Sequence, residues 1–132
     1  SFAGPIMAPD EFAVADFAGK PLVINMFGSW CPPCNAEAPD LATFAAENPG
    51  AQVVGIACED TEEGAVGFME EFGLTYPLVM ASGKIQSDYG VRALPVIYII
   101  DQNGIVKEQI MGFSAAAGTV IENLVKKQLT NR

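Results

Sequence analysis

Residues 21–34 read PLVINMFGSWCPPC, an apolar run followed by two cysteines three positions apart, and this stretch decides the fold. Residues 21–27 are mostly apolar and include β-branched side chains, a pattern that predicts a buried strand. Apolar residues then recur at helical spacing over 32–47, which predicts a helix. Pro39 lies inside this helix and should kink it, because proline has no N–H and clashes with the carbonyl one turn back. The two cysteines therefore lie where a buried strand turns into a helix.

This placement gives the two cysteines different chemical roles. Cys31 lies at the N-terminus of the predicted helix, where free N–H groups and the helix dipole stabilise a thiolate. Cys34 lies one turn further along on the same face, close enough to close a short disulfide. Pro32 takes a first-turn position where its missing N–H is tolerated, and together with Pro33 it stiffens the loop. Such a pair performs thiol–disulfide exchange: an exposed Cys31 attacks a partner disulfide, and Cys34 resolves the mixed disulfide.

Strands and helices alternate along the rest of the chain. Strands are expected at 52–57, 77–80, 95–100 and 105–111, and helices from the N-cap Thr61 to Glu71, at 83–89 and after the N-cap Ser114. An Asn103-Gly104 turn joins the last two strands in a hairpin. On the last helix, the residues expected on the buried side are Val120, Ile121, Leu124 and Val125. This order predicts an α/β fold, a central mixed β-sheet flanked by helices in three layers, as a single domain over 1–132 with an irregular lead-in at 1–11.

Composition narrows the functions that the chain can have. It has 132 residues, 50% hydrophobic and 17% charged, with a net charge of −9, which argues against a disordered or nucleic-acid-binding protein. There is no histidine, which excludes hydrolases that need an imidazole base and most zinc enzymes. Nine acids and no basic residue lie between Lys20 and Lys84. This acidic stretch indicates a solvated face, or alternatively a surface that steers the chain toward a cationic protein partner.

The beginning of the chain, SFAG, has no initiator methionine and no basic or apolar leader. It resembles a processed chain from which a signal peptide or membrane anchor has been removed. The apolar runs at 21–27 and 95–100 are far shorter than the roughly 20 residues that span a bilayer. The chain as given is therefore expected to be soluble.

Two segments resemble a known family. MFGSWCPPCNAEAP at 26–39 resembles the active-site segment of thioredoxin-fold proteins, and most closely that of the extracytoplasmic TlpA/ResA/CcmG (DsbE-like) thiol–disulfide oxidoreductases. That family reads Trp-Cys-x-Pro-Cys-x-x-Glu-x-Pro, and every fixed letter is present. GVRALPVIYIIDQNG at 90–104 resembles the family's cis-proline strand and hairpin. The resemblance spans nearly all of 12–129 and implies a thioredoxin-like three-layer sandwich, with the family's strand–helix insertion within 52–80.

The resemblance implies a role for each residue of the site. Cys31 would be the nucleophile and Cys34 the resolving thiol, while Glu37 would be a buried proton acceptor whose pKa is raised by burial. Pro95 would be the cis-proline facing the disulfide, and Leu94 would offer its backbone to a substrate strand. The substrate-binding residues implied are Trp30, Pro32, Pro33, Leu94 and Pro95.

Two positions depart from the family pattern. Asn25 stands where plain thioredoxins have a buried aspartate, and because asparagine cannot relay a proton, Glu37 becomes the stronger candidate. Leu94 is bulkier and less polar than the threonine or valine often found before the cis-proline, which bears on substrate preference. Outside such a motif, a single glutamate on a helix is more often a solvated side chain.

The third cysteine, Cys58, lies near the end of a predicted strand. A buried free cysteine in such a place behaves as a small apolar residue. A second redox thiol is the alternative, and rapid alkylation of the folded protein would reveal it. Cys58 together with the pair leaves a four-ligand zinc site incomplete, so no metal is expected.

The resemblance also implies a function. It indicates a reductant of protein disulfides in the bacterial envelope, periplasmic or otherwise extracytoplasmic, that serves for example cytochrome c maturation. Its partners would be protein thiols and disulfides, apocytochrome c among them, and a membrane electron donor of the DsbD/CcdA type. The resemblance implies no nucleic-acid partner and no cofactor beyond the Cys31–Cys34 disulfide. An envelope oxidant and a redox-inert thioredoxin-like binding module remain alternatives. A peroxidase would need a cysteine in a different setting, and a Sco-like copper carrier would need a histidine ligand.

Overall fold

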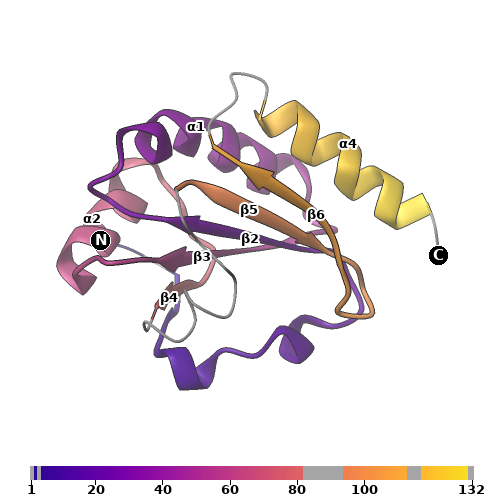
Figure 1. Ribbon diagram of the computed structural model, residues 1–132, viewed down its shortest axis with the longest axis horizontal. Helices are drawn as coiled ribbons and strands as arrows, with labels where there is room; N and C mark the ends of the chain where they lie inside the picture. Colours follow the sequence, from indigo (N-terminus) through magenta and orange to yellow (C-terminus); the bar gives the residue numbers. More distant parts are fainter. Residues whose placement is uncertain (1, 3, 82–93, 113–116, 131–132) are drawn as a thin grey trace.

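One mixed sheet organises the chain in a computed structural model that describes residues 2, 4–81, 94–112 and 117–130 (Figure 1). The strands are β1 Ile6–Met7, β2 Leu22–Phe27, β3 Gln52–Ala57, β4 Leu78–Met80, β5 Val96–Ile100 and β6 Val106–Met111, and the α-helices are α1 Pro32–Glu47, α2 Glu62–Glu71 and α4 Ala117–Thr130. Within these ranges the strand order is β1-β4-β3-β2-β5-β6. Strands β1, β4, β3 and β2 run parallel to one another. On the other side of β2, β5 pairs antiparallel with β2, and β6 pairs antiparallel with β5. This confirms the predicted mixed α/β sheet.

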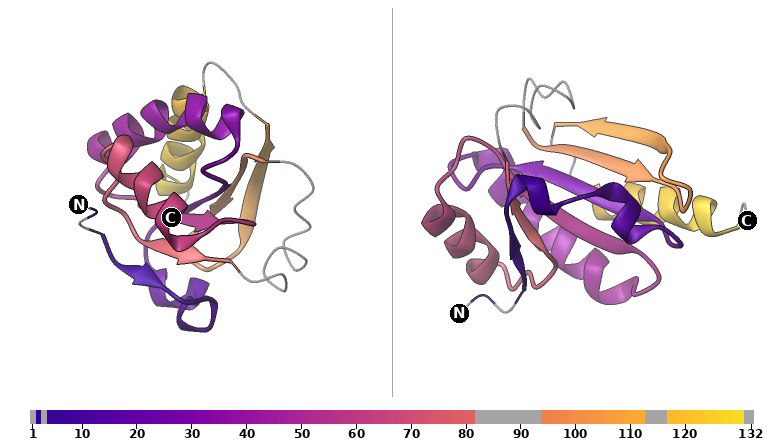
Figure 2. Two further views of the ribbon diagram at one scale, coloured as in Figure 1. Left: turned by 90° about the vertical axis from the view of Figure 1, so that its left-hand side faces the viewer. Right: turned by 90° about the horizontal axis from the view of Figure 1, so that it is seen from below.

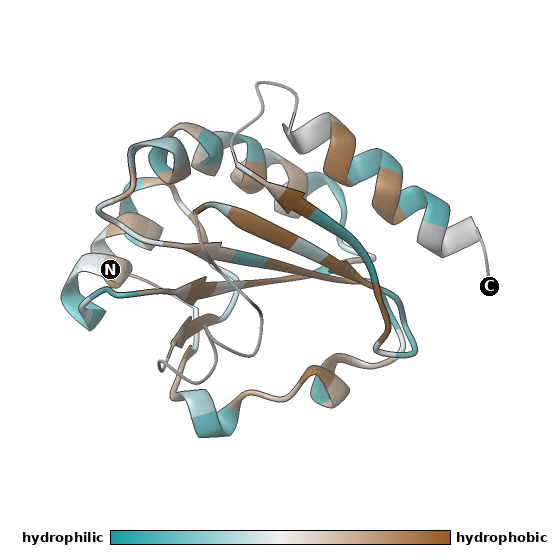
Figure 3. Ribbon diagram, viewed as in Figure 1, coloured by the Kyte–Doolittle hydropathy of each residue, from teal (hydrophilic) through white to brown (hydrophobic). Residues whose placement is uncertain are grey.

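The central strand β2 is buried along its whole length. Side chains alternate between the faces of a sheet, so Val23 and Phe27 pack on one side while Ile24 and Met26 pack on the other. A parallel strand covered on both faces is expected to be almost continuously apolar, and Figure 3 shows the apolar character of the central strands. Asn25 is the exception, because it is a polar residue only 2% exposed in the middle of β2.

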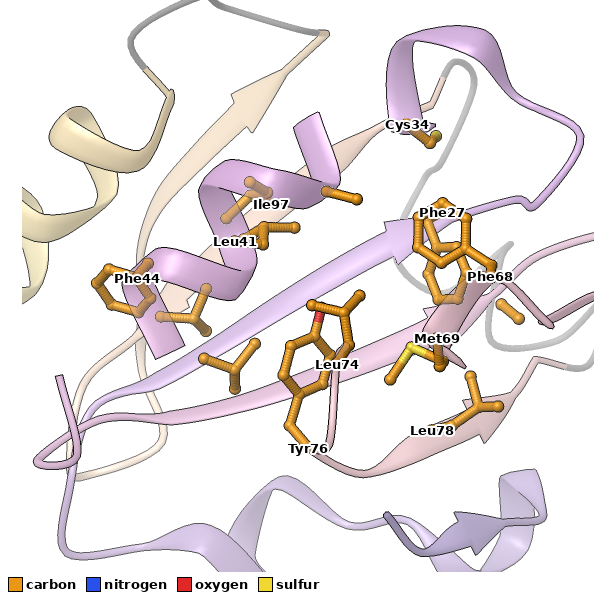
Figure 4. Close-up of a cluster of buried hydrophobic side chains, with 14 of the residues drawn as sticks. Phe27, Cys34, Leu41, Phe44, Phe68, Met69, Leu74, Tyr76, Leu78 and Ile97 are labelled. Atoms are coloured by element: carbon orange, nitrogen blue, oxygen red, sulfur yellow. The ribbon is translucent and has the colours of Figure 1, made fainter. Parts of the chain in front are cut away.

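The two faces of the sheet are covered differently. Buried residues of α1, α2 and α4 share one apolar cluster with Val23 and Phe27, and Figure 2 shows these helices together on one side of the sheet. The rings of Phe27 and Phe68 stack with centroids 4.6 Å apart, which ties α2 to the end of β2 (Figure 4). The opposite face is covered by the N-terminal segment, which includes 3-10 turns at Pro9–Glu11 and Val14–Phe17. The helix predicted at 83–89 lies outside the described residues.

Several predicted boundaries are confirmed. Helix 32–47 and strand 52–57 occur with the predicted limits. Thr61 caps α2, since its hydroxyl accepts a hydrogen bond from the Gly64 N–H at 3.0 Å, and Gly73 follows the helix with a φ of +66°. The predicted cap Ser114 lies outside the described residues.

The hairpin between β5 and β6 is confirmed, but its turn is longer than an Asn-Gly pair. The Gly104 N–H donates to the Asp101 carbonyl at 3.0 Å, and Gly104 has a φ of +85°. The Asp101 carboxylate accepts from the N–H groups of Asn103 and Ile105 at 2.9 and 3.0 Å. The Asp101 side chain therefore organises the turn, and the pairing register shifts between Ile99 and Ile100.

Two expectations are wrong. Part of the segment 1–11 is regular, because Ile6–Met7 pairs in parallel with β4 as strand β1; two residues are too few to show an alternating pattern. Val120 is 39% exposed, whereas Ile121 and Val125 are buried. Residues four apart lie on the same side of a helix, so Ile121 and Val125 define the buried stripe and Val120 lies at its edge. No helix within the described ranges has the length and apolar character needed to cross a bilayer.

Candidate active site

Cys31 is the N-cap residue of α1, as the sequence predicts. Its backbone is extended, with φ −93° and ψ 110°, and its N–H donates to the Gly28 carbonyl at 3.1 Å. The Cys34 N–H donates to the Cys31 Sγ at 3.3 Å. The sulfur therefore receives one of the free N–H groups at the start of the helix, which stabilises negative charge on it. Cys31 and Cys34 are thus adjacent at the start of α1, in contact through the Cys34 N–H and the Cys31 sulfur.

The expectation of an exposed Cys31 is wrong. Cys31 is 3% exposed and Cys34 is 2% exposed. The Cys31 sulfur turns inward, toward the Cys34 N–H and toward the Leu94 carbonyl oxygen at 3.7 Å. The neighbouring residues Pro32 and Pro33 are exposed, and Trp30 is 55% exposed. The sulfur thus lies directly beneath an exposed rim, and its attack on a partner disulfide requires a local opening around Cys31.

Leu94 and Pro95 lie across the site from the cysteines. The peptide bond between them is cis, as the resemblance implies. Pro95 is buried directly before β5, and its carbonyl accepts from the Gly112 N–H at 2.9 Å. Leu94 is partly buried and packs against the apolar clusters on both faces of the sheet. The structure therefore brings together the five residues predicted to bind substrate and the two cysteines, from segments about sixty residues apart.

A hydrogen-bonded bridge that the sequence did not reveal fixes the loop before Cys31. The Asp60 carboxylate accepts from the N–H of Ser29 at 2.7 Å and from its hydroxyl at 2.8 Å. The Trp30 indole N–H donates to the Cys58 carbonyl at 3.2 Å. A Cβ on Gly28 would collide with the Trp30 indole, so the present position of the indole depends on this glycine. These contacts hold the loop between β2 and α1 against the loop between β3 and α2; the only sequence signal was an acid preceding a helix cap.

Glu37 is buried, as the resemblance implies. It lies three residues after Cys34 on α1, a spacing that places both on one face, and it is 1% exposed. Neither carboxyl oxygen has a hydrogen-bond partner in the described part of the chain. Burial, with a further contribution from the Asp40 charge, raises the pKa of Glu37 to about 7. A carboxyl group with this pKa can take up and release a proton near neutral pH.

We expect the raised pKa of Glu37 to make folding stability depend on pH. Between its ordinary pKa of 4.5 and about 7 the folded chain holds a proton that the unfolded chain has lost. Stability from this group is therefore present below pH 4.5 and is lost as the pH rises through 7, by about 3 kcal/mol. Urea unfolding of the native chain and of Glu37→Gln at pH 4.5, 6 and 8 measures it. The difference between the two free energies of unfolding should change by that amount, and a constant difference would contradict the assigned pKa.

Cys58 has the properties of an inert core residue. It is 2% exposed, and its thiol lies 3.7 Å from the Ile56 carbonyl oxygen. Burial, aided by the charges of Glu59 and Asp60, raises its pKa from 9.0 to about 12. These properties favour the apolar interpretation over a second redox thiol.

The protection of Cys58 can be measured by alkylation. In a Cys31→Ser/Cys34→Ser chain, the only thiol left should react with N-ethylmaleimide at pH 8 at least about a thousandfold more slowly when folded than in urea, because so little thiolate forms. Mass spectrometry of timed, acid-quenched samples gives both rates. Comparable rates in the two states would instead indicate an accessible second thiol.

The fold and the cysteine pair at the start of α1 define a thioredoxin-like protein. A model of the AhpC/TSA family matches residues 1–109, and the chain belongs to that family. It is 36% identical over 100 residues to the thiol:disulfide interchange protein DsbE of Pseudomonas aeruginosa, covering 74% of this chain and 54% of that protein. It is 33% identical over 105 residues to the thiol-disulfide oxidoreductase ResA of Bacillus thuringiensis, covering 77% of this chain and 61% of that one. The chain therefore spans little more than half the length of these relatives.

Solved structures have the same architecture. A DsbE-type thiol:disulfide interchange protein from Chlorobium tepidum superposes with a TM-score of 0.81 at 26% identity, covering 97% of this chain and 92% of that chain. A secreted Mycobacterium tuberculosis disulfide oxidoreductase homologous to Escherichia coli DsbE gives 0.74 at 30% identity, covering 88% and 87%. The predicted thioredoxin-like fold is thereby confirmed.

Proposed function

We propose that the chain is a thiol–disulfide oxidoreductase that reduces protein disulfides through Cys31 and Cys34. The observation that carries the proposal is the position of the Cys31 sulfur, which receives the Cys34 N–H on one side and faces the carbonyl of Leu94, before cis-Pro95, on the other. A substrate disulfide that displaces the exposed residues beside Cys31 would reach a Cys31 sulfur that already lies next to Cys34, the resolving thiol. The names of the relatives DsbE and ResA support this chemistry.

The reaction transfers two electrons in two steps. The Cys31 thiolate attacks one sulfur of the substrate disulfide, that bond breaks, and the departing substrate thiolate takes up a proton. Glu37 then accepts the proton of Cys34, and the Cys34 thiolate attacks the Cys31 sulfur. The second substrate thiolate leaves and is protonated, so the substrate gains two thiols while Cys31 and Cys34 become a disulfide. The disulfide itself carries the electrons, so the proposal includes no metal and no organic cofactor.

The surroundings of Cys31 favour the reducing direction. A stabilised thiolate makes a disulfide strongly oxidising, and burial of Cys31 opposes the stabilisation that the Cys34 N–H provides. The Asp60 carboxylate bonds to Ser29 in the loop that carries Cys31, and the sequence has no basic residue between Lys20 and Lys84. Both effects disfavour the thiolate and therefore support a reductant over an oxidant.

The proposal extends to the setting of the reaction. The resemblance of 26–39 to extracytoplasmic proteins supports a location in the bacterial envelope. In a longer precursor, a membrane anchor would hold the chain there. Protein disulfides, including that of apocytochrome c, would be the substrates, and a membrane donor of the DsbD/CcdA type would restore the dithiol.

Equilibration in graded thiol–disulfide buffers tests the proposed direction. The Cys31 and Cys34 thiols are trapped with an alkylating agent and counted by mass. A two-electron transition near about −270 mV, the value of thioredoxin, is the expected result, whereas one near about −120 mV would indicate an oxidant. If no reversible transition occurs, the fold serves as a redox-inert binding module.

A further inference from the structure

Four buried oxygen atoms in the described residues have no hydrogen-bond partner: Asn25 Oδ1, both carboxyl oxygens of Glu37 and the Tyr76 hydroxyl oxygen. They come from three parts of the chain, namely β2, α1 and the segment between α2 and β4. Buried polar atoms almost always have a partner, whether protein or ordered water. That all four come from three residues calls for a common explanation.

The three side chains lie in one layer, between the sheet and α1. Asn25 is on the same face of β2 as Val23 and Phe27, two residues away on either side. Its register partner on β3 is Gly55. The Tyr76 ring covers that glycine so closely that a Cβ there would lie 3.2 Å from the ring. A glycine inside a strand often marks such a close approach.

Tyr76 also lies within electrostatic reach of Glu37. The Glu37 charge, together with burial as the larger cause, raises the pKa of the Tyr76 phenol. Asn25 lies near the same hydroxyl and opposes this shift, although the contact does not have the geometry of a hydrogen bond. Figure 4 shows the Tyr76 ring standing over β3 with its hydroxyl directed toward the α1 side of the sheet. Asn25, Glu37 and Tyr76 are thus neighbours whose unpartnered oxygen atoms form no direct hydrogen bonds with one another.

We propose that a buried water molecule joins Tyr76, Asn25 and Glu37, and that Tyr76 is a positioning residue for the Glu37 carboxylate. The donors and acceptors balance: the Tyr76 O–H donates to the water, and the water donates to Asn25 Oδ1 and to one Glu37 oxygen. A buried water typically makes about three such bonds to otherwise unsatisfied groups. The inference deepens the proposed function, on which the catalytic importance of Glu37 rests, because it adds a residue that controls when Glu37 is ionised.

The proposed link stabilises the ionised form of Glu37. Hydrogen bonds to a charged group are stronger than those to a neutral one, so a water held by the Tyr76 hydroxyl favours the carboxylate. Among the described residues, the titratable groups coupled to Glu37 are Asp40 from its own helix and Tyr76 from the segment before β4. The strand β2 contributes the neutral amide of Asn25. Removing the Tyr76 hydroxyl should therefore move the titration of Glu37 upward.

Tyr76→Phe tests the inference, because it removes one oxygen and keeps the ring over Gly55. Tyr98→Phe is the matched control, since the Tyr98 hydroxyl accepts from Gln109 at 3.1 Å and Tyr98 belongs to the apolar cluster on the opposite face of the sheet. Infrared difference spectra recorded against pH follow the C=O band of protonated Glu37, which is assigned as the band missing in Glu37→Gln. The midpoint should rise by about one pH unit in Tyr76→Phe and stay unchanged in Tyr98→Phe.

A crystal structure of the native chain at a resolution that shows ordered water provides the second measurement. We expect a water within hydrogen-bond distance of all three residues, and its loss or displacement in Tyr76→Phe. An empty site in the native chain, or an unmoved midpoint in Tyr76→Phe, overturns the inference. Neither measurement requires turnover, so both remain decisive if the proposed activity fails.

Discussion

Replacing Cys31 by serine is expected to abolish disulfide reduction. Serine cannot supply the thiolate that attacks the substrate, so dithiothreitol-driven reduction of insulin should fall to the background rate, a loss of at least about a thousandfold. Cys34→Ser should lose turnover to a similar extent for a different reason. Its Cys31 can still attack, but the mixed disulfide has no resolving thiol and should accumulate.

Cys58→Ser is the matched control for these two variants. It removes a third buried thiol, 2% exposed, which the reaction does not use, and it should keep the native rate once folding is verified by near-ultraviolet circular dichroism. Turnover that survives Cys31→Ser would contradict the assignment of the nucleophile. Such a result would support a binding function for the fold.

Replacing Glu37 by glutamine is expected to slow the resolving step by about a hundredfold or more, a usual effect of removing a general base. The carboxylate accepts a proton only when it is ionised. Because its pKa is raised to about 7, the native rate of mixed-disulfide resolution should rise as the pH increases through 7 and then level off. Glu37→Gln should lose this rise, as measured by stopped-flow mixing of a preformed mixed disulfide at pH 5.5 to 9.

Asp40→Asn provides a control that leaves the base in place. The Asp40 charge helps to raise the pKa of Glu37, so its removal should shift the inflection toward lower pH while the plateau rate is retained. Equal rates and equal inflections in the native chain and in Glu37→Gln would show that another group takes the proton of Cys34.

The local parts of this molecule could be predicted from the sequence, because their signals are contiguous. The helical pattern after Cys31 defines α1 with the limits that the structure has, and the apolar run before Gly28 defines β2 to within one residue. The cysteine pair consequently falls at the helix N-terminus, and the sulfur receives the Cys34 N–H as expected from that position. Burial of Glu37 followed from the family motif rather than from its spacing alone.

The burial of Cys31 could not be predicted in this way. Its exposure depends on a segment 63 residues further along the chain, where the Leu94 carbonyl comes within 3.7 Å of its sulfur. The hydrogen bonds from Ser29 to Asp60 could not be predicted either, because they join two loops that are far apart in the sequence and share no sequence pattern. The position of Tyr76 had one indirect sequence signal, which is Gly55, a glycine within an otherwise mostly apolar strand that the Tyr76 ring covers.

Identification of the sulfur that bonds to a substrate tests the central claim most directly. Cys34→Ser is mixed with a peptide disulfide, quenched with acid within seconds and digested, and the adduct is located by mass spectrometry. The account predicts one peptide per chain, attached to Cys31, with Cys58 unmodified. An adduct at Cys58, or no adduct at all in the folded protein, would contradict it.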